Sequence, residues 1–125
     1  MTDSKFLDSS AWLSYFYAEN IKIKTVVESD DFLLSSALSI FEIKLKMLKD
    51  KRQLSEIQQS LDFLKKRSLV LSVSEDVALN AVEISFKHSL HAIDALIYAS
   101  AIKKNATLIT LDNDFRRLDN VVILN

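Results

Sequence analysis

Five carboxylates of this chain lie beside or inside short apolar runs, or early in an expected helix: Asp8, Glu42, Asp94, Asp112 and Asp114. If these side chains reach one centre, their like charges raise one another's pKa, and a divalent cation removes the repulsion. Oxygen ligands in a chain without cysteine favour Mg²⁺ or Mn²⁺ over zinc. One or two such ions suit phosphoester hydrolysis, because they polarise the phosphoryl oxygen and activate the attacking water.

Four of these acids also have an ordinary structural interpretation. Asp8 could shape a turn or cap a helix, since serines follow it directly. Glu42 is the third helical position of a capping box that begins at Ser39. Asp112 and Asp114 could together cap a short helix. Taken singly, these acids therefore leave the structural and the functional interpretation both open.

Asp94 is harder to explain by structure alone, because it lies within the apolar stretch 91–97. An unpaired buried charge costs several kcal/mol or is neutralised. A helix dipole contributes only about 0.3–1 kcal/mol, which would not keep this carboxylate ionised in a dry site. A cation shared with other acids would keep the carboxylate of Asp94 ionised.

Composition excludes several classes of protein. A chain of 125 residues with 49% hydrophobic and 26% charged residues is expected to be one globular domain, 1–125, with its own core. The absence of cysteine excludes disulfides and thiolate chemistry, and the absence of glycine excludes a P-loop, a Rossmann fingerprint and an EF-hand. With no leader segment and no apolar run long enough to span a bilayer, we expect a cytoplasmic protein without membrane contact.

The net charge is −1, but the distribution of charge says more about possible partners than the net value does. If the five acids surround cations, 12 acids remain against 16 lysines and arginines, so the remaining surface carries a surplus of about four positive charges. Such a surface is compatible with a polyanionic substrate.

The elements that must position these acids alternate along the chain. Continuous apolar runs predict five buried strands, at 4–8, 32–36, 69–73, 107–111 and 121–124. Single helices or helix pairs between them predict a three-layer α/β/α sandwich with a central parallel sheet of about five strands. Ligands of such sheets bind beyond the carboxyl ends of the strands, which is where Asp8 and Asp112 fall.

Helix boundaries follow from capping residues and helical spacing. A first helix capped by Ser9 or Ser10 is expected through Tyr17, and Asn20 begins a second. The remaining helices are expected at 39–51, from Ser55 to about 67, at 74–88, at 90–104 and, as a turn or two, at 113–118. Without glycine, left-handed backbone must fall to residues such as Asn20, Asn105 and Asn120.

Four motifs in this order, at 6–11, 39–42, 94–101 and 108–115, resemble the acidic motifs of PIN-domain ribonucleases. They are most similar to those of the small VapC-type toxins of toxin–antitoxin pairs. The resemblance spans nearly the whole chain, and its two C-terminal motifs are the most specific. Departures are Ser9-Ser10 where Thr-Asn is common and Asn105 where Gly is usual; neither removes a carboxylate.

This resemblance implies roles for each acid. Asp8, Glu42, Asp94 and Asp112 would be the catalytic residues that hold Mg²⁺ or Mn²⁺, and Asp114 would bind a second ion or position water. The expected activity is metal-dependent hydrolysis of RNA phosphodiester bonds. The resemblance also implies a homodimer and a small antitoxin protein as a partner.

Other residues are weighed more evenly. Arg116 and Arg117 could hold RNA phosphates or form an ordinary solvated face. His88 and His91 are more simply explained as polar helix residues than as general bases. The helix pair 38–67 could offer a groove to an amphipathic segment of a partner.

Two rival functions remain. A catalytically inactive PIN-like module that binds RNA or protein would have lost some of the acids, yet all are present. A phosphoacceptor signalling domain would carry paired acids after its first strand, where Asp8 stands alone.

Overall fold

The computed structural model describes residues 4–125 and contains a five-stranded sheet in the order β3-β2-β1-β4-β5, with every neighbouring pair parallel. The strands are β1 Ser4–Leu7, β2 Phe32–Ser36, β3 Ser68–Leu71, β4 Thr107–Thr110 and β5 Val121–Ile123. The chain moves outward from β1 to β3 and then returns to the other side of β1 as β4. The carboxyl ends of β1 and β4 therefore form the switch point at which open parallel sheets bind ligands.

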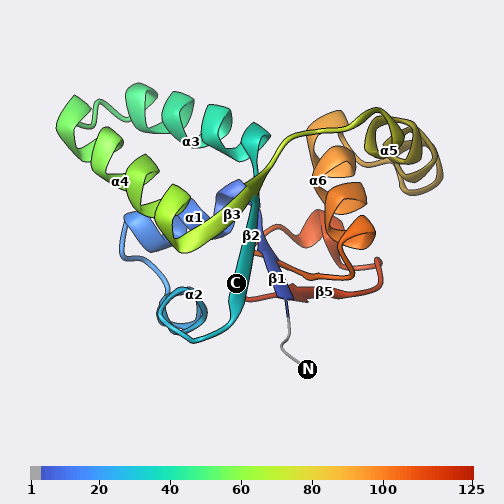
Figure 1. The fold of residues 1–125 in the computed structure, drawn as a ribbon, viewed down its shortest axis with the longest axis horizontal. Helices are drawn as coiled ribbons and strands as arrows, with labels where there is room; N and C mark the ends of the chain where they lie inside the picture. The colour runs from blue at the N-terminus through green and yellow to red at the C-terminus, as the bar shows by residue number, and fades with distance from the viewer. Residues whose placement is uncertain (1–3) are drawn as a thin grey trace.

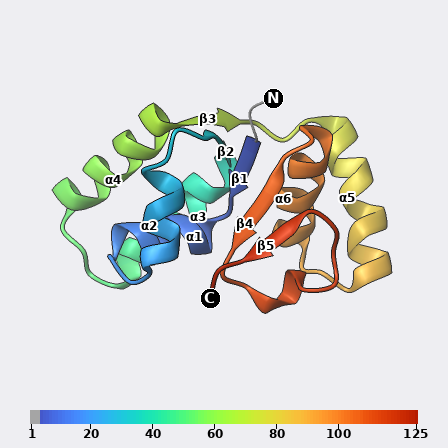
Figure 2. The same cartoon turned by 90° about the horizontal axis from the view of Figure 1, so that it is seen from below.

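Helices cover both faces of this sheet, which confirms the predicted three-layer α/β/α architecture (Figure 1). One layer holds four helices: α1 Ser9–Phe16, α2 Ile21–Val27, α3 Ala37–Lys49 and α4 Leu54–Arg67. The other layer holds α5 Glu75–His88 and α6 Ala92–Lys103, and the turned view in Figure 2 shows the same separation. No helix within residues 4–125 is long and apolar enough to cross a membrane.

Alternating side chains of the central strands supply two separate cores. On β1, Phe6 packs into the core under α5 and α6, whereas Leu7 packs into the core under the other four helices. Leu108 and Ile109 divide between the same two cores on β4. Because successive strand residues point to opposite faces, a strand buried on both sides must be apolar throughout. The continuous apolar runs of the sequence have this origin.

Two predicted helix starts are wrong. The first helix is capped by Asp8, whose carboxylate accepts from the Ala11 amide, and not by a serine. Helix α3 begins at Ala37 with Ser36 as its cap, so the predicted capping box at Ser39 does not exist. The Ser39 hydroxyl is buried inside the helix without a hydrogen-bond partner in residues 4–125. Glu42 therefore has no capping role, and the interpretation of Glu42 as part of a capping box is wrong.

Smaller boundary differences follow from neighbouring elements. Strand β3 begins at Ser68, immediately after α4, and ends two residues before the predicted end at 73. Helix α6 begins at Ala92 and not near residue 90.

Left-handed backbone is confirmed at Asn105 and Asn120. Asn20 is extended and caps α2 through its side chain. In the described residues, Ala18, Lys51 and Ser89 adopt the left-handed conformation despite having a side chain.

Candidate metal centre

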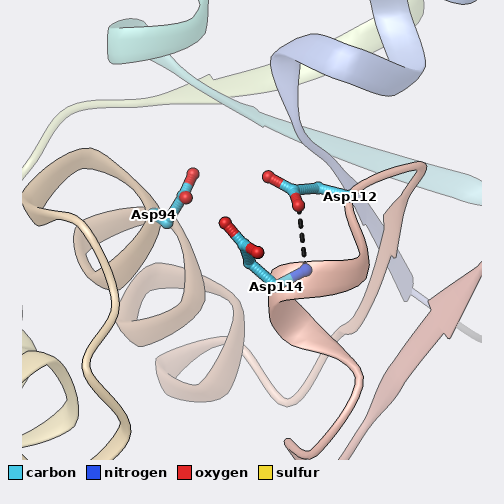
Figure 3. A group of neighbouring side chains, drawn as sticks. All are labelled: Asp94, Asp112 and Asp114. Carbon is cyan, nitrogen blue, oxygen red and sulfur yellow. Dashed lines mark hydrogen bonds between the residues drawn. The ribbon is translucent and has the colours of Figure 1, made fainter.

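Three carboxylates meet at the carboxyl edge of the sheet. Asp94, Asp112 and Asp114 each offer an oxygen within 4.8 Å of the oxygens of the other two. Asp94 comes from the first turn of α6, and the other two follow β4 (Figure 3). In Figure 3 the three side chains converge on the space between α6 and the turn after β4. Three oxygens at this spacing could ligate one ion.

The turn after β4 fixes the relative positions of its two acids. Asp112 Oδ1 accepts from the Asp114 amide at 2.9 Å and so caps the short 3-10 helix Asn113–Phe115. The structural interpretation of Asp112 is therefore confirmed, yet it uses only one carboxylate oxygen. Asp112 Oδ2 accepts no hydrogen bond within residues 4–125, and this oxygen could serve a cation.

Asp8 lies at the end of β1, only 6% exposed, and is held by three donors. The Ala11 amide and the Ser10 hydroxyl donate to its Oδ1 at 3.0 and 2.6 Å, and the Thr110 hydroxyl donates to its Oδ2. Burial raises the pKa of this carboxyl, as does the charge of Asp112, while the three donors lower it. Asp8 is thus oriented by hydrogen bonds before any ligand binds.

A hydroxyl network joins the two strands that carry acids. Ser10 Oγ accepts from the Leu111 amide at 3.1 Å, and Thr110 Oγ1 accepts from the Asp112 amide at 3.0 Å. Since both hydroxyls also donate to Asp8, they connect the end of β1 to the turn that presents Asp112.

Glu42 lies on α3 and is partly buried. Burial raises the pKa of its carboxyl, the Ser9 hydroxyl lowers it, and the charge of Asp8 raises it further. Glu42 is therefore an electrostatic neighbour of Asp8 but lies outside the three-carboxylate group.

Electrostatics identify Asp94 as the centre of the cluster. Its pKa is raised from 3.8 to about 6, first by burial and then by the charges of Asp112, Asp8 and Glu42, whereas His91 lowers it. Acids from three other segments thus act on this one carboxyl group. The possible ligands are all carboxylate oxygens that repel one another, which fits a hard divalent cation better than a soft one.

Of the four acids expected to hold metal, Asp94 and Asp112 lie in the three-carboxylate group. Asp114, expected to be an accessory acid, belongs to the three-carboxylate group together with Asp94 and Asp112. Asp8 and Glu42 stand beside that group and not in it.

Other side chains near the site were less evident. Ser10 was expected only as a cap or as a departure from the family motif, and no role was predicted for Thr110; the sequence signal for both is a small hydroxyl residue at a buried strand end. Arg116 and Arg117 line a groove with Asp114, and His88 and His91 are exposed in the same groove.

Comparisons with known proteins show the family and the fold. The model of the PIN domain family matches residues 5–121. A toxin–antitoxin complex from Klebsiella pneumoniae contains a chain with a TM-score of 0.82 and 20% identity, covering 97% of this chain and 98% of that one.

Two further solved structures share the fold. VapBC2 from Rickettsia felis, bound to a DNA fragment from its promoter, gives a TM-score of 0.79 at 20% identity over 96% of both chains. VapC20 from Mycobacterium tuberculosis, a toxin that cleaves the sarcin–ricin loop, gives 0.74 at 18% identity, over 92% of this chain and 95% of that one. A comparison with curated protein sequences gives no significant match.

Proposed function

This chain belongs to the PIN domain family, and we propose that it is a Mg²⁺- or Mn²⁺-dependent endoribonuclease, the toxin of a toxin–antitoxin pair. The observation that carries the proposal is the convergence of Asp94, Asp112 and Asp114. Burial first, and then the charges of neighbouring acids, raise the pKa of Asp94 to about 6. Like charges this close repel one another, and a bound cation would relieve that repulsion. The VapC-like fold of its structural neighbours supports the same activity.

Each acid then has a proposed task. Asp94, Asp112 and Asp114 would hold one ion, and Asp8 and Glu42 would extend the site toward a second. When bound, Mg²⁺ or Mn²⁺ supplies polarisation of a phosphoryl oxygen and activation of water. The protein supplies the fixed positions of the carboxylates, because the donors to Asp8 and the cap at Asp112 hold these side chains in place.

Two apolar helix faces favour two protein partners. On α3, Phe41, Leu45 and Leu48 are exposed at positions that share one side of the helix. This face belongs to the helix pair that we expected to bind a partner's amphipathic segment, and we assign it to a small antitoxin.

On α5, Leu79, Val82 and Phe86 are likewise exposed, and Phe86 is 92% exposed. We assign this second face to another copy of the chain, which gives a homodimer. The cytoplasm, where RNA and the antitoxin would be available, is the proposed location.

The nuclease proposal is tested by assaying RNA cleavage by the protein purified without its partner. We expect cleavage with Mg²⁺ or Mn²⁺, loss of cleavage with EDTA, and loss on Asp94→Asn. Asp30→Asn is the matched control, because Asp30 is an exposed aspartate outside the site. Cleavage that survives both the chelator and Asp94→Asn would contradict the proposal.

A further inference from the structure

A positively charged groove adjoins the acidic cluster. It is a cavity of about 560 Å³ between the end of α5, the turn into α6 and the segment after residue 115. Its charged and titratable lining consists of Lys87, His88, His91, Asp114, Arg116 and Arg117. Asp114 is the only one of these that also belongs to the three-carboxylate group, so the groove and the candidate metal centre share a wall.

The cations of this groove have no acidic partner. Within residues 4–125, Lys87, Arg116 and Arg117 form no ion pair, whereas other cations of the fold do, as Arg52 does with Glu56. All three are exposed. Arg116 Nη1 donates to the Asn113 carbonyl at 3.1 Å, which holds this guanidinium against the turn that carries Asp114. The groove therefore presents three cations and one carboxylate, Asp114, and among the described residues none of the three cations is paired with an acid.

This arrangement complements a polyanion that must approach an acidic site. The carboxylates repel phosphates wherever a bound cation does not screen them. A strand of RNA whose scissile phosphate sits at Asp94 and Asp112 therefore needs positive charge on at least one side. Arginine offers planar, bidentate donors that match phosphate oxygens, and lysine adds a point charge.

From this juxtaposition we infer that the groove binds backbone phosphates of the RNA strand next to the bond that is cut, through Lys87, Arg116 and Arg117. The inference rests on the proposed nuclease function and extends it to the way the substrate is held. Phosphate contacts position a strand and carry no base information. The groove therefore contributes to affinity for RNA and to its orientation, and not to the choice of sequence.

Binding and cleavage are measured separately. Binding of a fluorescent single-stranded RNA to the Asp94→Asn protein is followed by anisotropy at several salt concentrations. Each phosphate contact to a single strand adds about 0.7 to the slope of log affinity against log salt. Arg116→Ala with Arg117→Ala should therefore lower that slope by about 1.4 and weaken binding at least tenfold.

The matched control removes two neighbouring cations elsewhere. Lys65 and Lys66 are exposed in the last turn of α4, which leads into the amino end of β3 and so lies at the opposite edge of the sheet. Lys65→Ala with Lys66→Ala should leave the salt slope unchanged. An equal drop in slope for both double variants would overturn the inference, because it would show only a general effect of charge. Circular dichroism melts check that both variants fold.

A small substrate separates the groove from the metal centre. Bis(4-nitrophenyl) phosphate has no flanking phosphate, so kcat/KM for its Mn²⁺-dependent hydrolysis should be unchanged by the arginine substitutions, while KM for RNA rises about tenfold. Equal losses on both substrates would overturn the inference, since the arginines would then act at the metal centre. If the unaltered protein cleaves neither substrate, the nuclease proposal fails. The salt dependence of RNA binding, compared with and without the two arginines, still tests whether the groove binds RNA. The inference would also be overturned if the groove bound an acidic peptide while the arginine substitutions left the salt dependence of RNA binding unchanged.

Discussion

Thr110 connects Asp8 to the turn that carries Asp112, and Thr110→Val should show how strongly this connection holds the site. The side chain is fully buried, and valine has nearly its shape but no hydroxyl. The substitution removes the donor to Asp8 Oδ2 and the acceptor of the Asp112 amide at the same time.

The expected magnitude follows from these two bonds. A hydrogen bond to a charged group contributes about 1.5–3 kcal/mol, and a buried donor left without a partner costs about 1–3 kcal/mol. Asp8 keeps its bonds to Ser10 and Ala11, so part of the loss is recovered by rearrangement. We therefore expect the free energy of unfolding to fall by roughly 2–4 kcal/mol. The pKa of Asp8 should also rise, because the Thr110 bond lowers it.

Urea denaturation at pH 7 in EDTA measures the stability, and Mn²⁺-dependent melting measures the site. Thr110→Ser, which keeps the hydroxyl, should recover most of the loss. Thr107→Val is the control, since Thr107 lies at the other end of the same strand and its side chain makes no hydrogen bond within residues 4–125; its effect should stay within about 0.5 kcal/mol. If Thr110→Val is as mild as this control, the connection between Asp8 and Asp112 does not stabilise the site.

Three further outcomes are expected. Because the native state raises the pKa of Asp94 from 3.8 to about 6, native protein without metal binds this proton more tightly than the unfolded chain, and the free energy of unfolding should fall as pH rises across that window. Asp94→Asn should reduce this dependence of stability on pH. It should also stabilise the metal-free protein at pH 7 by on the order of 1 kcal/mol in urea titrations, a value that allows for the screening of the partly buried charge by water. An unchanged dependence on pH would contradict the assignment of the raised pKa to Asp94. Ser36→Ala should cost about 1 kcal/mol by removing the cap of α3, whereas Ser39→Ala, which loses no hydrogen bond, should cost less in the same assay; the reverse order would restore the capping box. Mn²⁺ should raise the melting temperature of the unaltered protein and do so much less for Asp112→Asn; equal shifts would contradict the role of Asp112 as a ligand, and little shift in the unaltered protein would favour an inactive scaffold.

The sequence was sufficient for the architecture because burial on both faces leaves a readable pattern. Phe6 and Leu7 enter opposite cores, so two consecutive apolar residues are needed in β1, and Leu108 and Ile109 meet the same need in β4. The first residue of α3 could not be predicted from the pattern of apolar residues. Serines 35, 36 and 39 all precede helical residues, and the choice depends on where β2 ends beside β3, at the pair Ser36–Leu71.

In the candidate site, too, some residues could be predicted from the sequence and others could not. Its acids are evident because carboxylates are unusual at the ends of apolar runs. The hydroxyls that hold them are not, since serine and threonine are ordinary in strands and turns. Only the parallel register Leu7–Ile109 brings Thr110 level with Asp8, and this pairing joins residues about one hundred positions apart. The shared wall between Asp114 and the arginine groove likewise depends on tertiary structure.

Anomalous diffraction from a manganese-soaked crystal tests the central claim most directly. A peak within coordination distance of carboxylate oxygens from Asp94, Asp112 and Asp114 is the predicted result, and Asp112→Asn should weaken it. Manganese bound elsewhere, with these three side chains turned away from one another, would contradict the account.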